Sequence, residues 1–334
     1  MRKVGFWKIR RRGFTLVELL TVMVIIGILV SLITVAVIAA RARATAARVG
    51  VDIAGLEQAL NSYRDKFGEY PPDCAELLTA PSAVRQMIRA AFVQHFSRAF
   101  PRYVITGTST DAQWNTLRSV LSNQFSIDIY YLDSATSLTF FLGGVPEIVN
   151  RQFTGRLIGF SANPTNPFDT VSASRIPPFF DFDPSRLVQT NRNWFRYQPP
   201  YGSGSQVPPY VYFRAPYYYL NGNQVNVMEW RRINATGGGE TEQFGTTQQS
   251  RMAQPSVRPY YNETAAVTTF SAEKFFNPRS FQILCAGADS NYGGVVVGYD
   301  STRGPRFPIS DNISGGYLDN QANFVRGVLE DLTK

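Results

Sequence analysis

The sequence has few of the residues on which hydrolytic and metal-dependent enzymes rely. Its 334 residues include one histidine, His95, and two cysteines, Cys74 and Cys285. The sequence shows no Ser/His/Asp triad motif around this histidine, a single histidine cannot form a histidine metal cluster, and the cysteines lack zinc spacing. The glycines at 237–239 precede Glu240, whose charge is unsuited to a phosphate-binding loop. The sequence therefore predicts a protein that is not an enzyme.

Charge is missing from a long stretch near the N-terminus. No charged residue occurs in the 22 residues from Leu19 to Ala40, which is long enough to cross a membrane as a helix. A single carboxylate, Glu18, precedes this run, in a position where a charge is costly and usually functional. Six basic and no acidic residues stand before Gly13, a pattern that keeps this end cytoplasmic: Arg2, Lys3, Lys8, Arg10, Arg11 and Arg12.

The segment RRRGFTLVE, residues 10–18, resembles the class III signal of type IV prepilins and type II secretion pseudopilins. The resemblance implies that a prepilin peptidase cuts between Gly13 and Phe14 and methylates the new N-terminus at Phe14. It also implies that Glu18 pairs with the terminal amine of a neighbouring subunit during filament assembly. Both charges are costly in lipid unless they are paired, and assembly supplies the partner.

Two other N-terminal elements share a basic start and an apolar run. A secretory signal peptide has an apolar core of roughly 7–15 residues, shorter than this run, and Glu18 would interrupt it. A plain membrane anchor is the remaining alternative. Removal of a leader at residues 1–13 would lower the formal charge from +8 to +2, because all six basic residues go with it. We therefore expect no nucleic-acid partner.

An amphipathic pattern continues beyond the apolar run. Its apolar residues recur every three or four positions: Val49, Ile53, Leu56, Leu60, Tyr63 and Phe67. This spacing predicts one long helix over 14–67, with a transmembrane part at about 16–40. Gly68 and the prolines at 71–72 end it. The segment GEYP, residues 68–71, resembles the end of the same helix in the major pseudopilin.

The remainder, 68–334, is predicted to form one extracytoplasmic globular head with an insertion at about 80–200. Apolar spacing predicts helices near 82–98, 111–121 and 134–142, with Asp111 capping the second and His95 of the first at a surface or an interface. Strands are predicted at 209–213 and 217–220, and residues 281–285 form a strand-like run. The expected fold class is α+β: a pilin-like lollipop whose long N-terminal helix packs on an antiparallel β-sheet head with helical insertions.

The two cysteines leave two alternatives open. A head outside the cytoplasm would permit a Cys74–Cys285 disulfide. Cys285 alternates with Phe281 and Ile283 in a strand-like run and is expected to point into the core, where a free cysteine is common.

A glycine-rich segment near the C-terminus carries several oxygen ligands of the kind that calcium prefers. Major pseudopilins hold calcium in such a loop. The resemblance implies a Ca²⁺ site at Asp289, Asp311 and Asn312, and a polar turn-rich loop is the alternative.

The resemblance as a whole implies a structural subunit of a type II secretion pseudopilus or a type IV pilus-like filament. Such a subunit waits in the bacterial inner membrane as a single-pass protein, with a cytoplasmic leader and a periplasmic head. Its implied partners are the prepilin peptidase, other pilin or pseudopilin subunits in a homopolymer, and an inner-membrane assembly platform. Two alternatives remain: a minor pilin whose large head binds a ligand or a surface, and a membrane-anchored extracytoplasmic enzyme.

Overall fold

The computed structural model divides the chain into two compact units, residues 1–45 and 46–334. In the part of the chain that the structure describes, four helices lead into a series of short strands, and the predicted α+β class is confirmed. The residues that the structure describes are 15–74, 82–149, 152–190, 193–201, 207–215, 219–220, 224–225, 228–229, 256–257, 259–260, 275–287, 292, 320–325 and 327–329.

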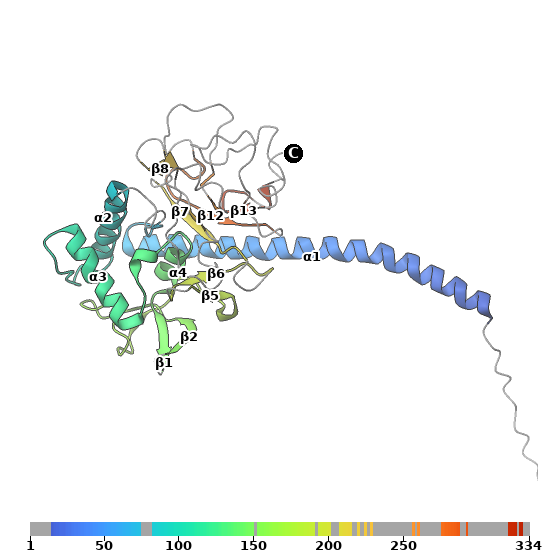
Figure 1. The fold of residues 1–334 in the computed structure, drawn as a ribbon, viewed down its shortest axis with the longest axis horizontal. Helices are drawn as coiled ribbons and strands as arrows, with labels where there is room; N and C mark the ends of the chain where they lie inside the picture. The colour runs from blue at the N-terminus through green and yellow to red at the C-terminus, as the bar shows by residue number, and fades with distance from the viewer. Residues whose placement is uncertain are drawn as a thin grey trace, which may run out of the picture. The chain divides into compact units, whose positions relative to one another are not determined.

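The described part of the first unit is the beginning of helix α1, which runs from Leu16 to Phe67 (Figure 1). Residues 16–44 are all exposed, including Leu29 with 52% of its surface accessible. An 18-residue window of α1 has a mean hydropathy of 3.0, and none of it is buried. By length and composition this part of α1 could cross a membrane. A helix that is apolar all round needs a cover, which lipid would supply.

The remainder of α1 belongs to the second unit and is buried along one stripe. Its buried residues are Val49, Ile53, Leu56, Ala59, Leu60, Tyr63 and Phe67. The predicted stripe is therefore confirmed, with Ala59 in addition. The helix ends at Phe67, and Gly68 adopts a φ of +85° while its N–H donates to the carbonyl of Arg64 at 2.7 Å. Glycine accepts this left-handed conformation without strain, so the predicted cap is also confirmed.

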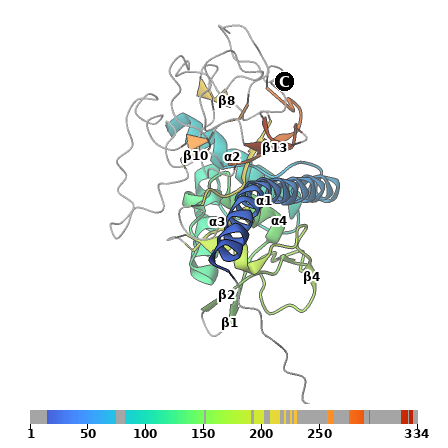
Figure 2. The same cartoon turned by 90° about the vertical axis from the view of Figure 1, so that its right-hand side faces the viewer.

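Three shorter helices follow: α2 (Ser82–Ala99), α3 (Thr110–Phe125) and α4 (Thr136–Gly143). They match the three predicted helices, and α2 and α3 pack against each other (Figures 1 and 2). The predicted cap at Asp111 is wrong. Ser109 caps α3 instead, because its side chain accepts from the N–H of Ala112 at 3.2 Å.

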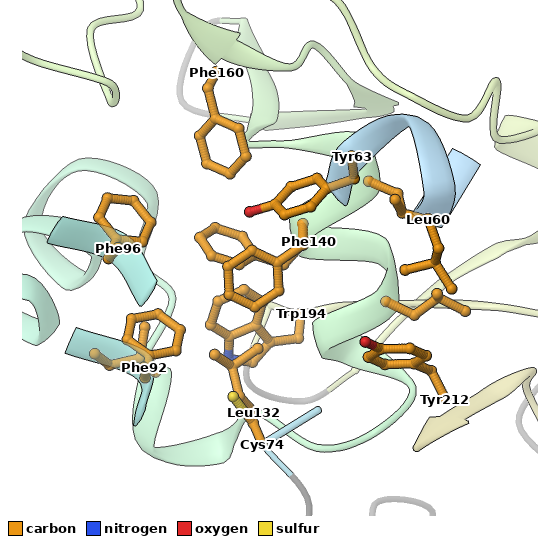
Figure 3. Close-up of a cluster of buried hydrophobic side chains, with 14 of the residues drawn as sticks. Leu60, Tyr63, Cys74, Phe92, Phe96, Leu132, Phe140, Phe160, Trp194 and Tyr212 are labelled. Carbon is orange, nitrogen blue, oxygen red and sulfur yellow. The ribbon is translucent and has the colours of Figure 1, made fainter. Parts of the chain in front are cut away.

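A three-stranded antiparallel sheet, in the order β13–β12–β7, separates two cores. Its strands are β7 (Val211–Arg214), β12 (Phe281–Cys285) and β13 (Gln321–Ala322). Alternate side chains of β12 point to opposite faces, as in any strand. Phe281, Ile283 and Cys285 join the main core, whereas Leu284 joins a smaller one. The main core also contains rings from α1, α2 and α4, among them Tyr63, Phe92 and Phe140 (Figure 3).

The other described strands are short and pair antiparallel in twos. These pairs are β1 (Pro146–Val149) with β2 (Gln152–Leu157), β3 (Phe160–Ser161) with β4 (Arg175–Ile176), β5 (Leu187–Gln189) with β6 (Phe195–Tyr197), β8 (Tyr219–Leu220) with β9 (Gln224–Val225), and β10 (Met228–Glu229) with β11 (Ser256–Val257). Two 3₁₀ turns, η1 (Ile129–Tyr131) and η2 (Pro184–Arg186), connect helices and strands. The predicted strands at 209–213 and 217–220 correspond to β7 and β8, residues 217–218 lie outside the described residues, and the strand-like run at 281–285 is β12. Strands β1 and β8 lie on opposite sides of the second unit (Figure 2).

Candidate functional site

Thr15 and Glu18 form a reciprocal pair at the start of α1. The N–H and the hydroxyl of Thr15 each donate to Oε2 of Glu18 at 2.9 Å, and the N–H of Glu18 donates to Oγ1 of Thr15 at 3.2 Å. This arrangement is a capping box, in which two N–H groups of the first turn find partners that the helix itself does not provide. The carboxylate also lies at the positive end of the helix dipole.

The pairing with Thr15 occupies only one of the two carboxylate oxygens of Glu18. Both bonds from Thr15 end on Oε2 of Glu18, and the described residues give Oε1 no partner. An ionised carboxylate can accept on both oxygens. Glu18 is therefore oriented by its own chain and can still accept from a donor of another chain. Sequence reasoning overlooked the capping box, although its signal, Thr followed three residues later by Glu before an apolar run, is present.

The other polar side chains of the apolar run are satisfied within the helix. The hydroxyls of Thr21, Ser31 and Thr34 each donate to a carbonyl three or four residues earlier, at 2.6–2.7 Å. No hydroxyl in this stretch then needs water, as a hydrocarbon surrounding requires. Glu18 is the one charged group from 16 to 40.

Most of the other predicted site residues lie outside the described residues: Gly13, Phe14, Asp289, Asp311 and Asn312. Within the described ranges, no group of three His, Cys, Asp or Glu side chains is placed to hold a metal ion. Cys74 and Cys285 are both buried and free, so the structure does not contain the disulfide. Burial raises the pKa of the Cys285 thiol to about 12, which disfavours the reactive thiolate. The expected inward orientation of Cys285 is confirmed.

The prediction that His95 lies at a surface or an interface is wrong, because its side chain is buried within the chain, in a polar network at the end of α1. Its Nε2 is 2.8 Å from the hydroxyl of Tyr63, and its Nδ1 is 2.9 Å from the carboxylate of Glu69. Glu69 also pairs with Arg98 at 3.1 Å and with Arg214 at 3.0 Å. The network therefore joins the end of α1 to α2 and β7.

The surroundings set the charges of this network. Hydrogen bonds from His95 and Arg214 lower the pKa of Glu69 to about 2. Burial lowers the pKa of His95 below 6.5, even though Glu69 opposes the shift. Near neutral pH the network is thus an ionised Glu69 held by two arginines and a neutral imidazole. Burial raises the pKa of Tyr63, so its hydroxyl stays protonated. These contacts stabilise the packing of α1 against α2 and β7. The network contains no exposed nucleophile.

A second polar cluster fixes the earlier part of the same helix. Asp52 of α1 pairs with Arg186 at 2.5 Å and accepts from the hydroxyl of Tyr210 at 2.7 Å. The guanidinium of Arg186 also lies over the ring of Tyr197, 4.3 Å from its centroid. The amphipathic part of α1 is therefore anchored at both ends by charged groups.

Comparisons with known proteins bear on the N-terminal region. Residues 8–34 match the family described as "Prokaryotic N-terminal methylation motif". The chain is 38% identical over 77 residues to the type II secretion system core protein G of Klebsiella pneumoniae, a match that covers 22% of this chain and 55% of the relative. It is 39% identical over 75 residues to that of Klebsiella michiganensis, covering 22% of this chain and 53% of the relative.

A third relative, the core protein G of Pectobacterium carotovorum, is 39% identical over 62 residues, which cover 19% of this chain and 40% of the relative. The chain thus spans about half the length of the curated relatives that it matches, or less. No solved structure matches it. The N-terminal region therefore carries the prepilin methylation motif and is homologous to core protein G, as the RRRGFTLVE segment indicated.

Proposed function

We propose that this protein is a structural subunit of a type II secretion pseudopilus or a related filament, cut by a prepilin peptidase and assembled through α1. One observation carries the proposal: the methylation motif at 8–34 runs into the exposed apolar part of a helix that begins at Leu16 and whose first turn holds a single carboxylate, Glu18. An apolar helix of this kind can be covered by lipid or by other copies of itself. The filament provides the second cover.

The geometry at Glu18 supports a specific assembly contact. In the proposed reaction, cleavage after Gly13 frees the amine of Phe14. The amine of a neighbouring subunit then binds Oε1 of Glu18, the oxygen that Thr15 leaves free. Two charges that are costly in lipid would be neutralised in one step. The bonds from Thr15 hold the carboxylate in place meanwhile.

The proposal also implies the partners of the subunit and its location in the cell. The subunit would wait in the inner membrane with the second unit on the periplasmic side, and it would contact the peptidase, an assembly platform and other copies of itself. Its role would be mechanical. The basic residues before Gly13 support this orientation, because positively charged flanks stay cytoplasmic.

Intact-mass analysis of the full chain, expressed with and without a prepilin peptidase, tests the proposal. We expect a product that starts at Phe14 and carries one added methyl group, formed only with the peptidase. Gly13→Leu should block both changes, and Gly5→Leu is the matched control that should not. A product that starts near Ala42 or Thr45 would instead indicate ordinary signal peptidase and overturn the proposal.

The size of the second unit favours one alternative within the same class. The match to core protein G covers only 22% of this chain, and α2, α3 and α4 lie in the part beyond the predicted long helix. A minor pilin whose head binds a ligand or a surface would fit such an enlargement. Copy number separates the two: a major subunit forms most of the filament mass, whereas a minor one is present in a few copies.

We also propose that the C-terminal segment binds calcium through Asp289, Asp311 and Asn312. The proposal is supported by their oxygen ligands and by the resemblance to major pseudopilins. Calcium a hundredfold above its dissociation constant would stabilise the folded chain by about 2.7 kcal/mol. We expect chelation to lower the melting temperature of the full chain in detergent, and Asp311→Ala to abolish the difference. Equal melting curves with calcium and with chelator would contradict the proposal.

A further inference from the structure

We propose that Arg41 and Arg43 bind the phosphates of anionic phospholipids in the leaflet that faces the second unit. The inference rests on the proposed membrane-inserted function. The two residues follow directly on the charge-free run that ends at Ala40. Twenty-two helical residues span roughly 33 Å, and the hydrocarbon core of a bilayer is about 30 Å thick. With Glu18 at one boundary, both arginines then lie in the opposite headgroup layer.

The helix presents the two side chains on opposite sides. Residues two positions apart differ by about 200° around an α-helix, so Arg41 and Arg43 point away from each other. Both are exposed. Long arginine stems can follow the apolar helix surface while their charged ends reach the phosphates. Phosphate contacts on two opposite sides of the helix would fix how deeply it lies in the bilayer.

No partner within the described residues competes for these guanidinium groups. Neither Arg41 nor Arg43 makes an ion pair or a side-chain hydrogen bond in the described parts of the chain. The acidic residue that follows them most closely, Asp52, is already held by Arg186 and Tyr210. Arginine binds phosphate through two parallel N–H···O bonds, which suits a headgroup better than a single point charge would.

Leader removal would make this contact more important. Before cleavage, six basic residues flank the apolar run on its N-terminal side and only Arg41, Arg43 and Arg48 flank it on the other before Asp52. After cleavage at Gly13 the six are lost, and the basic flank lies on the side of the second unit. The leader would then no longer oppose outward movement of the helix. The arginine–phosphate contacts would set the depth of the waiting subunit, and they must break when it enters a filament.

Lipid selectivity of the full chain in vesicles tests the inference. Association of spin-labelled phosphatidylglycerol is compared with that of spin-labelled phosphatidylcholine, at low and high salt. We expect a preference for phosphatidylglycerol that weakens in high salt. Arg41→Gln/Arg43→Gln should reduce it, by up to about fivefold for each arginine. Arg102→Gln/Arg156→Gln removes the same charge from exposed positions of the second unit and should leave the preference unchanged.

The outcomes separate this inference from the proposed function. The leader contributes equally in all variants, so the difference between them reports on Arg41 and Arg43. An unchanged preference for phosphatidylglycerol in the Arg41/Arg43 variant would overturn the inference. If that variant also failed to form filaments, the two arginines would instead pair with carboxylates of a second copy of the chain. Flotation of the full chain with vesicles in urea reports membrane insertion. A chain that does not float would overturn the proposed function as well.

Discussion

Helix α1 is one continuous helix whose two parts meet different surroundings. Leu29 in its first part has 52% of its surface exposed, whereas Leu60 in its second part is fully buried. The first part is apolar on every side, and the second is apolar along one stripe. Both form the same helix, so local propensity does not distinguish them. The difference lies in what covers them: within the described residues the second part has its cover in its own chain, and the first part does not.

Substitutions in the two parts of α1 should therefore have different effects. A defect in the first part should impair assembly and leave the second unit folded, because contacts of the second unit do not depend on it. A defect in the second part should lower the free energy of unfolding and leave membrane insertion intact.

Glu18→Ala should abolish filament formation while leaving insertion and folding intact. The variant lacks the carboxylate that would pair with the Phe14 amine of a neighbour. Insertion should become easier, by less than the roughly 3 kcal/mol that a charge costs at the bilayer centre, because Glu18 lies at one end of the apolar run. Electron microscopy of filaments, flotation with vesicles and near-ultraviolet circular dichroism measure the three properties. Asp65→Ala, at an exposed position of the same helix, is the control and should assemble normally. Normal filaments from Glu18→Ala would show that the carboxylate has another role.

Leu60→Ala should destabilise the second unit by about 2–5 kcal/mol, because it removes buried methyl groups and leaves a cavity in the main core. Leu29→Ala makes the same chemical change 31 positions earlier on α1, where the side chain is exposed, and should change the stability of the second unit by less than about 0.5 kcal/mol. Denaturant unfolding of the full chain in detergent measures both. Equal losses in the two variants would mean that the parts of α1 are not independent.

The sequence predicts the positions of α1 and the three shorter helices well, because helices depend on the spacing of apolar residues that are near one another in the chain. The stripe from Val49 to Phe67 and the cap at Gly68 follow from such local patterns. The surroundings of His95 do not, because its partners Tyr63 and Glu69 are 32 and 26 residues away. A histidine in an amphipathic helix can lie on either face until the packing partner is known.

The candidate site divides in the same way. The prepilin segment at residues 10–18 is a local pattern, and the similarity to core protein G at the N-terminus agrees with it. The capping box of Thr15 and Glu18 is local as well, because it joins residues three positions apart. The state of Cys74 and Cys285 depends on where the fold places two residues 211 positions apart. The separation of Cys74 and Cys285 in the sequence does not predict the distance between their sulfur atoms in the fold.

Acidification should destabilise the second unit in two stages that involve His95 and Glu69. The folded pKa of His95 is lowered, so the unfolded chain binds the proton first and stability falls as the pH drops below about 6.5. The folded pKa of Glu69 is about 2, so its contribution is complete above about 4.5 and is lost as the pH falls towards 2. Arg98, Arg214 and Tyr63 are the other polar groups that face the pair.

Glu69→Gln should remove most of the second stage, and it should cost about 1–3 kcal/mol near neutral pH because His95 and Arg214 lose a charged acceptor. Asp65→Asn, in an exposed pair with Arg64, should do neither. Denaturant unfolding of the full chain from pH 7 to pH 3 gives the comparison. A wild-type stability that stays constant across this range would refute the assigned protonation states.

The smallest effect is expected at the very start of α1. Thr15→Ala removes the hydroxyl that both donates to Glu18 and accepts from its N–H. Loss of an N-terminal cap typically costs about 1 kcal/mol, so the amides of the first turn should exchange about fivefold faster with deuterium in detergent. Thr15→Ser keeps the hydroxyl and should keep the slower exchange. The stability of the second unit should not change in either variant, because residues 15–18 belong to the first unit. If Thr15→Ala also lowered the unfolding free energy of the second unit, the two parts of α1 would be energetically coupled, and the separation argued from Leu29 and Leu60 would fail.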